Sequence, residues 1–115
     1  MTAFVDTSVL YAVLDADDKR HQDATTALGE ALGRERLVTT SYVVVETAAL
    51  VQRRLGLPAV RDLLERLVPS FDVRWVDQEL HEAGVDAMLS AGRRAVSLVD
   101  HVSFEHMRRR RSGRP

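Results

Sequence analysis

AFVDTSVL, residues 3–10, joins a short apolar run to an acid and then to a second apolar run. The first run predicts a buried strand over residues 3–5, and the helical spacing of the second predicts a helix over residues 8–14. Asp6 then lies at the carboxyl end of a strand. Open parallel sheets bind ligands at these ends, near a switch in strand order. We therefore expect Asp6 at the functional edge of a sheet.

The rest of the chain repeats this order of strand and helix. Apolar runs predict two more short strands, and amphipathic segments bounded by Gly, Pro and capping residues predict the helices between them. The alternation predicts an α/β fold, a three-layer α/β/α sandwich around a small parallel sheet. The expected strands are residues 36–39 and 73–76, and the expected later helices are residues 22–32 (with Ala24, Ala27, Leu28, Ala31 and Leu32 inward), 42–55, 58–68, 77–89 and 98–109.

Length and composition favour one compact domain over residues 1–115, because the chain has 115 residues and no biased linker. The absence of Cys excludes disulfides and thiolate zinc sites and suits a cytoplasmic protein. No apolar run approaches the roughly 20 residues that span a bilayer, so we expect no membrane partner. The net charge of -1 gives no general attraction to nucleic acid. The exception is the arginine-rich segment 108–115, expected as a basic, disordered tail that is either simply solvated or in contact with RNA.

Three acids each stand as the only acid in an apolar run: Asp6, Glu46 and Asp100. We expect such carboxylates to be drawn toward the core, where an unpaired charge is costly. None of the three runs contains Lys or Arg, so a shared divalent cation would offset that cost. Carboxylate oxygens suit Mg²⁺ or Mn²⁺. A metal of this kind promotes attack of water on phosphorus, so the acids predict phosphodiester hydrolysis.

Each acid also has a structural interpretation. Asp100 follows Ser97 by three residues, the spacing of a helix capping box. Glu46 could pair with Arg53, and Asp6 could cap the helix that follows it. If all three interpretations held, the chain would be a structural α/β domain without a metal site.

Four segments in order carry a resemblance: FVDTSVL at residues 4–10, the acidic turn at residues 14–18 with His21, VTTSYVVVE at residues 38–46, and SLVDHVSF at residues 97–104. Together they resemble the PIN domain, especially the VapC-like ribonuclease toxins of type II toxin-antitoxin systems. The resemblance covers nearly the whole chain. It implies a metal-dependent endoribonuclease that uses Mg²⁺, with Mn²⁺ as an alternative.

By position, the resemblance implies that Asp6, Glu46 and Asp100 are the catalytic, metal-binding acids. Ser8 corresponds to the family's nearby hydroxyl and is expected to orient the metal ligands. The implied partners are an RNA substrate, a VapB-like antitoxin and a second copy of the chain in a homodimer. Because an acidic groove attracts either a divalent cation or a guanidinium group, we expect the antitoxin to place a basic side chain near the three acids.

The chain departs from the resemblance at its C-terminus. Relatives continue after the helix that carries Asp100 into another strand and a fourth acid or equivalent polar residue, where this chain has its arginine-rich segment. We therefore expect the last strand and one metal ligand to be missing. The alternative function is a catalytically impaired or truncated PIN-like module that binds antitoxin or RNA.

Overall fold

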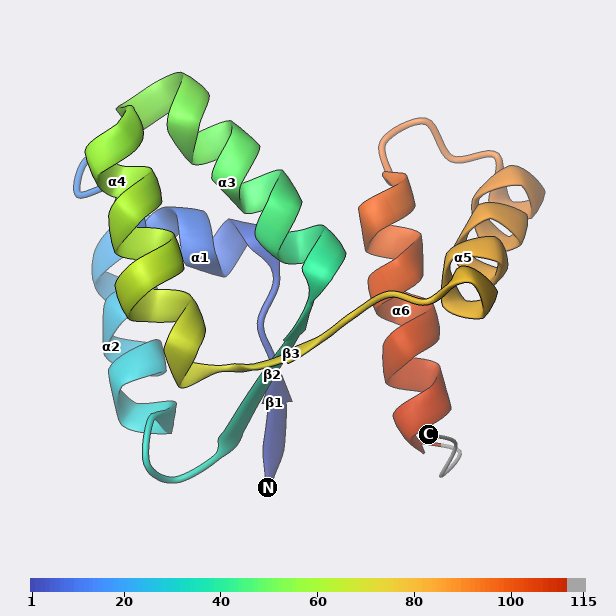
Figure 1. Cartoon of the computed structure of the whole chain (residues 1–115), viewed down its shortest axis with the longest axis horizontal. Coiled ribbons are helices and arrows are strands. Elements are labelled where there is room, and N and C mark those ends of the chain that lie inside the picture. The colour runs from blue at the N-terminus through green and yellow to red at the C-terminus, as the bar shows by residue number, and fades with distance from the viewer. Residues whose placement is uncertain (112–115) are drawn as a thin grey trace. The chain divides into compact units, whose positions relative to one another are not determined.

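The computed structural model describes residues 1–111, and the side chains of residues 1–110 (Figure 1). The chain divides into two compact units, Met1–Arg74 and Trp75–Pro115. Each unit has its own internal packing and is described by itself. The prediction that residues 1–115 form a single domain stays a prediction, and residues 112–115 of the expected basic tail lie outside the described residues.

The first unit is built on a small parallel sheet of β1 (Thr2–Phe4), β2 (Arg36–Thr40) and β3 (Asp72–Arg74). The strands lie in the order β1-β2-β3, with Ala3 opposite Leu37 and Thr39 opposite Val73. Because β2 lies between two neighbours, four of its five residues are buried. Within residues 1–111 the strand order does not reverse, so the expected switch point is not seen there.

Four helices follow the strands of this unit: α1 (Thr7–Leu14), α2 (His21–Ala31), α3 (Ser41–Leu55) and α4 (Leu57–Asp62). Thr40 caps α3 by accepting a hydrogen bond from the Val43 backbone N–H. α1 packs against both α2 and α3, and α3 packs against α4 (Figure 1). These contacts place the start of α1 against α3.

Two predictions about these helices were wrong in detail. The helix expected over residues 58–68 is interrupted: α4 passes into a π turn (Leu63–Leu67) and then a 3-10 turn (Val68–Ser70). Pro69 explains the break, because proline lacks the backbone N–H of a regular helix and its ring clashes with the preceding turn. In α2 only Ala24 and Leu28 are buried, since the helix ends at Ala31 and leaves Leu32 in extended backbone, partly exposed.

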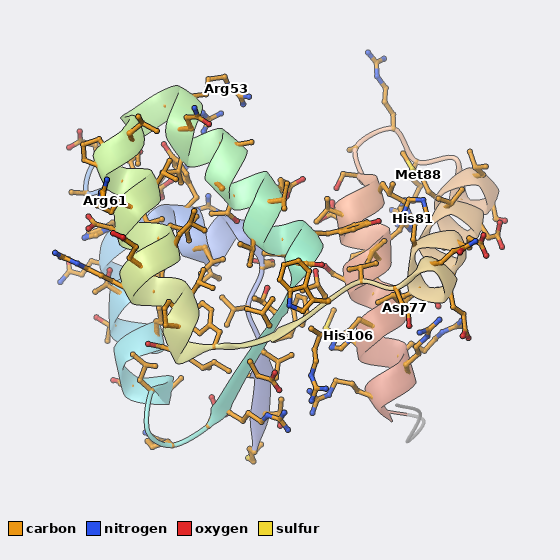
Figure 2. The ribbon with its side chains drawn as sticks, viewed as in Figure 1. Arg53, Arg61, Asp77, His81, Met88 and His106 are labelled. Atoms are coloured by element: carbon orange, nitrogen blue, oxygen red, sulfur yellow. The ribbon has the colours of Figure 1, made fainter. Side chains whose placement is uncertain are left out.

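The second unit is a helical hairpin of α5 (Gln78–Ala91) and α6 (Leu98–Arg111). Asp77 caps α5 by accepting a hydrogen bond from the Leu80 backbone N–H at 2.8 Å (Figure 2). Gly92 ends α5 in the left-handed conformation that glycine adopts readily, with φ of 61°. Gly84 allows close packing, because a side chain there would meet the backbone of Val102 on α6.

The start of the arginine-rich segment is helical, unlike the disordered tail expected from residue 108. α6 continues to Arg111, and two of its arginines pair with acids of the same hairpin, Arg108 with Glu105 and Arg109 with Glu79. The helix thus passes the end expected at residue 109. In the described part of the chain, no helix is long and apolar enough to cross a membrane.

Candidate active site

Asp6 lies between β1 and α1, as its position in the sequence predicts. The preceding residue is held firmly: Val5 N–H donates to the Val38 carbonyl at 2.9 Å, and the buried Thr39 hydroxyl donates to the Val5 carbonyl at 2.7 Å. Asp6 itself is the N-cap of α1, and its Oδ1 accepts a hydrogen bond from the Val9 backbone N–H at 3.2 Å. The loop therefore presents Asp6 from a rigid strand end.

Ser8 contributes a second hydrogen bond to Asp6. Its hydroxyl Oγ lies 2.8 Å from Oδ1 of Asp6. The predicted role of Ser8 as an orienting hydroxyl agrees with this contact. Both donors bind the same carboxylate oxygen, and within residues 1–111 Oδ2 of Asp6 accepts no hydrogen bond from the protein.

Glu46 comes from α3 and is brought to the start of α1. The Thr7 hydroxyl donates to Oε1 of Glu46 at 2.6 Å, across 39 positions of sequence. The alternative partner, Arg53, lies in the last turn of α3 and points outward (Figure 2). Thr7 is a residue that the sequence analysis missed, because only its position directly after Asp6 distinguished it from other hydroxyl residues.

Asp100 lies in the first turn of α6, in the second unit. Its Oδ2 accepts a hydrogen bond from the Ser97 backbone N–H, and the Ser97 hydroxyl accepts one from the Asp100 backbone N–H, each at 3.1 Å. This reciprocal pair is the predicted capping box. The structure thus joins Asp6 and Glu46 through Thr7 and its neighbour Ser8, and it does not place Asp100 relative to them.

The expectation that the acids are drawn toward the core was wrong for two of them. Asp6 and Asp100 are exposed, and Glu46 is half-buried. At a helix N-terminus the unpaired backbone N–H groups lie at the end of the helix, so a capping carboxylate turns to that end while its apolar neighbours face inward. The cost of burying an unpaired charge therefore does not arise for the two exposed acids.

The donor set of Asp6 and Glu46 is suited to a hard divalent cation. Hydroxyl donors orient one oxygen of each carboxylate, and no ion pair within residues 1–111 neutralises either side chain. Over the same residues, no group of three or more His, Cys, Asp or Glu side chains is arranged to hold a metal ion. Asp6 and Glu46 thus supply carboxylate oxygens, the type of ligand that a hard divalent cation prefers.

The opposite end of α1 carries a different acid. Asp15 accepts hydrogen bonds from the Tyr11 hydroxyl at 2.6 Å and from the Asp17 backbone N–H at 3.0 Å. Both bonds hold the pKa of Asp15 below its ordinary value, and the bond from Tyr11 has the larger effect. The same bond, together with burial, raises the pKa of Tyr11, while Arg54 lies over the Tyr11 ring at 5.4 Å from its centre. The carboxylate of Asp15 therefore stabilises the turn after α1.

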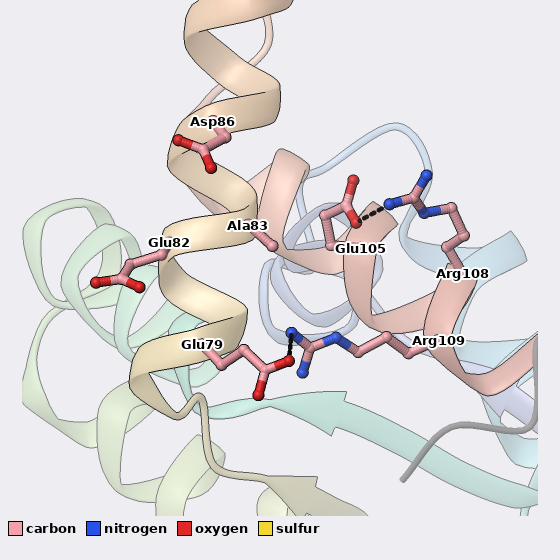
Figure 3. A pocket seen from close by; sticks show the side chains of 7 residues that line it. All are labelled: Glu79, Glu82, Ala83, Asp86, Glu105, Arg108 and Arg109. Carbon is pink, nitrogen blue, oxygen red and sulfur yellow. Dashed lines mark hydrogen bonds and ion pairs between the residues drawn. The ribbon is translucent and has the colours of Figure 1, made fainter.

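Two hollows in the surface have charged residues in their linings. One, of about 340 Å³, lies between α1 and α2, and its lining includes Ser8. The other, of about 560 Å³, lies between α5 and α6, where two ion pairs cross its charged wall (Figure 3). The charged residues of the second hollow are Glu79, Glu82, Asp86, Glu105, Arg108 and Arg109.

Comparison with known proteins places this geometry in context. The sequence profile of the PIN domain matches residues 3–112. The crystal structure of VapC20 from Mycobacterium tuberculosis, a toxin that cleaves the sarcin-ricin loop, superposes with a TM-score of 0.83. The two sequences are 30% identical, and the match covers 99% of this chain and 85% of the toxin. A search of curated proteins found no match.

Proposed function

We propose that this chain, which belongs to the PIN domain family and is a VapC-like nuclease, is a divalent-metal-dependent endoribonuclease and the toxin of a toxin-antitoxin pair. The observation that carries the proposal is that neighbouring hydroxyls at the start of α1 orient both acids, Ser8 bonding Asp6 and Thr7 bonding Glu46. Hydrogen bonds to hydroxyls orient the carboxylates without neutralising them. A pair of oriented anions is what a cation-dependent phosphodiesterase needs.

Asp6, Glu46 and Asp100 would hold Mg²⁺, or Mn²⁺ in its place. When bound, the ion would lower the pKa of water for attack on phosphorus and stabilise charge on the leaving oxygen. Ser8 and Thr7 hold the two carboxylates of the first unit in place before RNA arrives. The rigid end of β1 limits the movement of Asp6, because the Val5 backbone is bonded on both its N–H and its carbonyl.

The substrate proposed is RNA with an accessible, unpaired loop. VapC20 cleaves the sarcin-ricin loop, so a hairpin with that sequence is the first probe to use. Recognition of RNA by sequence generally targets unstacked loop bases, which a surface hollow can admit.

The partner proposed is a VapB-like antitoxin that places a basic side chain against the carboxylates of Asp6 and Glu46. A guanidinium group is attracted to this negative charge and can donate two hydrogen bonds to a carboxylate. Its binding would occupy the position of the metal and inhibit cleavage. A homodimer and a cytoplasmic location belong to the same proposal.

Cleavage of the sarcin-ricin hairpin with and without Mg²⁺ or Mn²⁺ tests the function. We expect metal-dependent cutting by the wild type, strong loss in Glu46→Gln, and no loss in Glu30→Gln, an exposed acid of α2 with the same change in charge. If several structured and unstructured RNAs remain intact at all metal concentrations, the chain is the alternative, a non-catalytic PIN-like binding module. If Glu46→Gln cuts as fast as the wild type, the assigned site is wrong.

A further inference from the structure

The hollow between α1 and α2 shares a residue with the candidate active site. Its lining consists of Ser8, Val9, Ala12, Arg20, Asp23 and Ala24. Ser8 is the residue whose hydroxyl donates to Asp6, so the hollow begins one hydrogen bond away from a proposed metal ligand. An RNA chain held with its phosphodiester at Asp6 would pass its neighbouring nucleotide over this hollow.

Arg20 lies at the rim of this hollow, and its terminal nitrogens are not engaged by the described residues. Asp18 anchors it at two points: Oδ1 accepts the Arg20 backbone N–H at 2.8 Å and lies 3.5 Å from Nε. Within residues 1–111 the two Nη groups donate to no protein acceptor, and the side chain is 58% exposed. The anchored guanidinium group can therefore present its Nη donors to a phosphate from solution.

The rest of the lining suits a base. Val9, Ala12 and Ala24 form an apolar wall of small side chains, and Asp23 adds one carboxylate that accepts no hydrogen bond from the described part of the chain. A volume of about 340 Å³ falls at the lower end of small-ligand sites, the size class of one nucleotide. The carboxylate can accept a hydrogen bond from the amino group of a base but not from a phosphate.

The hollow between α5 and α6 lacks these properties. Four carboxylates face two arginines there, and both arginines are paired, Arg108 with Glu105 and Arg109 with Glu79 (Figure 3). A polyanion would meet a net negative wall in that hollow. In the hollow beside Ser8 the lining has one acid and one arginine, and Arg20 pairs with Asp18 only through Nε, so its Nη groups make this hollow the better site for RNA.

We infer that the hollow between α1 and α2 is a nucleotide subsite, in which Arg20 binds a phosphate of the RNA and the apolar wall with Asp23 receives the base next to the cleaved bond. This inference rests on the proposed nuclease function and adds to it a place and a chemistry for substrate recognition. Asp23 favours bases that present an N–H donor to it, such as an exocyclic amino group, because a carboxylate only accepts hydrogen bonds.

The phosphate contact is tested by binding of the sarcin-ricin hairpin to Glu46→Gln protein at several salt concentrations. Arg20→Ala in this background should weaken binding about tenfold and lower the salt slope by about 0.7, the value for one phosphate of a single strand. The control is Lys19→Ala, which removes the same charge from an exposed neighbour outside the hollow and should change binding less than twofold. Arg20→Lys should restore part of the affinity.

The base contact is tested with hairpins in which single nucleotides near the cut are made abasic. At one of these positions, removal of the base should lower the affinity of the hairpin for protein with an unaltered hollow about tenfold. This is the loss expected for one bound base. Val9→Phe, which fills the hollow, should bind the intact and that abasic hairpin equally. If Val9→Phe does not fold, the same comparison with Asp23→Asn should show a changed preference between amino-bearing and amino-free bases at that position.

The outcomes separate the subsite from the nuclease function. If the wild type cuts RNA with metal but Arg20→Ala binds like Lys19→Ala, or no single base matters, the subsite is wrong and the nuclease function stands. If the wild type neither binds nor cuts RNA, both are wrong. If Arg20→Ala weakens only the binding of an antitoxin, the hollow belongs to a protein partner and the inference is overturned.

Discussion

The two ends of α1 carry aspartates that bond to the protein in different ways. Asp6 at the N-terminal end is exposed and, among the residues that the structure describes, accepts hydrogen bonds only through Oδ1, from Ser8 and Val9. Asp15 at the C-terminal end is half-buried and uses both oxygens, one for the Tyr11 hydroxyl and one for the Asp17 backbone. A carboxylate whose two oxygens both accept hydrogen bonds within the protein has a structural role. A carboxylate with one oxygen held by neighbours is oriented for a ligand.

The largest effect expected from this comparison is on cleavage. Asp6→Asn keeps the size of the side chain and removes its charge, so metal-dependent cleavage should fall about a hundredfold or more while the melting temperature hardly changes. Asp15→Asn should do the reverse, lowering the melting temperature by a few degrees and leaving cleavage within about threefold. Cleavage rates and thermal unfolding of both variants measure this. Loss of activity in both, in equal measure, would show that the two ends of α1 do not differ in role.

The next effect tests whether Thr7 positions Glu46. Thr7→Val preserves the shape but removes the hydroxyl that donates to Oε1 at 2.6 Å, so cleavage should fall about tenfold. Thr7→Ser retains the hydroxyl and should recover most of the rate. Thr25→Val, the same change at an exposed position of α2, is the matched control. A full rate in Thr7→Val would mean that Glu46 does not need this contact.

A divalent metal should affect the thermal stability of the Asp6 and Asp15 variants differently. Metal that binds the folded state stabilises it by about 2.7 kcal/mol at a hundredfold excess over its dissociation constant. Mn²⁺ should therefore raise the melting temperature of the wild type and of Asp15→Asn, and much less that of Asp6→Asn. Equal shifts in all three proteins would place the metal away from Asp6. No shift in any of them would favour the structural interpretation of the acids.

The smallest effect is the pH dependence of the Tyr11–Asp15 bond. The pKa of Asp15 is held below 3.8, so its contribution to stability is complete above that pH and is lost as acid approaches the lowered pKa. The pKa of Tyr11 is raised above 10.0, so its contribution is complete below pH 10 and is lost as the pH rises through the raised pKa. The difference in melting temperature between wild type and Asp15→Asn should therefore be constant near neutrality and shrink at both extremes. A difference that is flat over the whole range would assign the loss in Asp15→Asn to another cause.

The sequence by itself determined the order of the elements, most of their boundaries and two helix caps in the second unit. These depend on local physics: Ser97 and Asp100 form the predicted capping box, and Gly92 ends α5 as expected. Asp6 at the end of β1 was predicted for the same reason, because the strand and the helix that flank it are both encoded within ten residues.

Only the tertiary structure decided which acids are oriented by residues at the start of α1 and which side chains remain accessible to a ligand. The Thr7–Glu46 bond joins residues 39 positions apart, and the hollow beside Ser8 forms because α2 packs back onto α1 and brings Arg20 near. The prediction of buried acids failed for Asp6 and Asp100 on the same ground. Apolar neighbours in sequence show that an element is buried, but the direction of one side chain depends on which backbone groups and which other elements meet it in space.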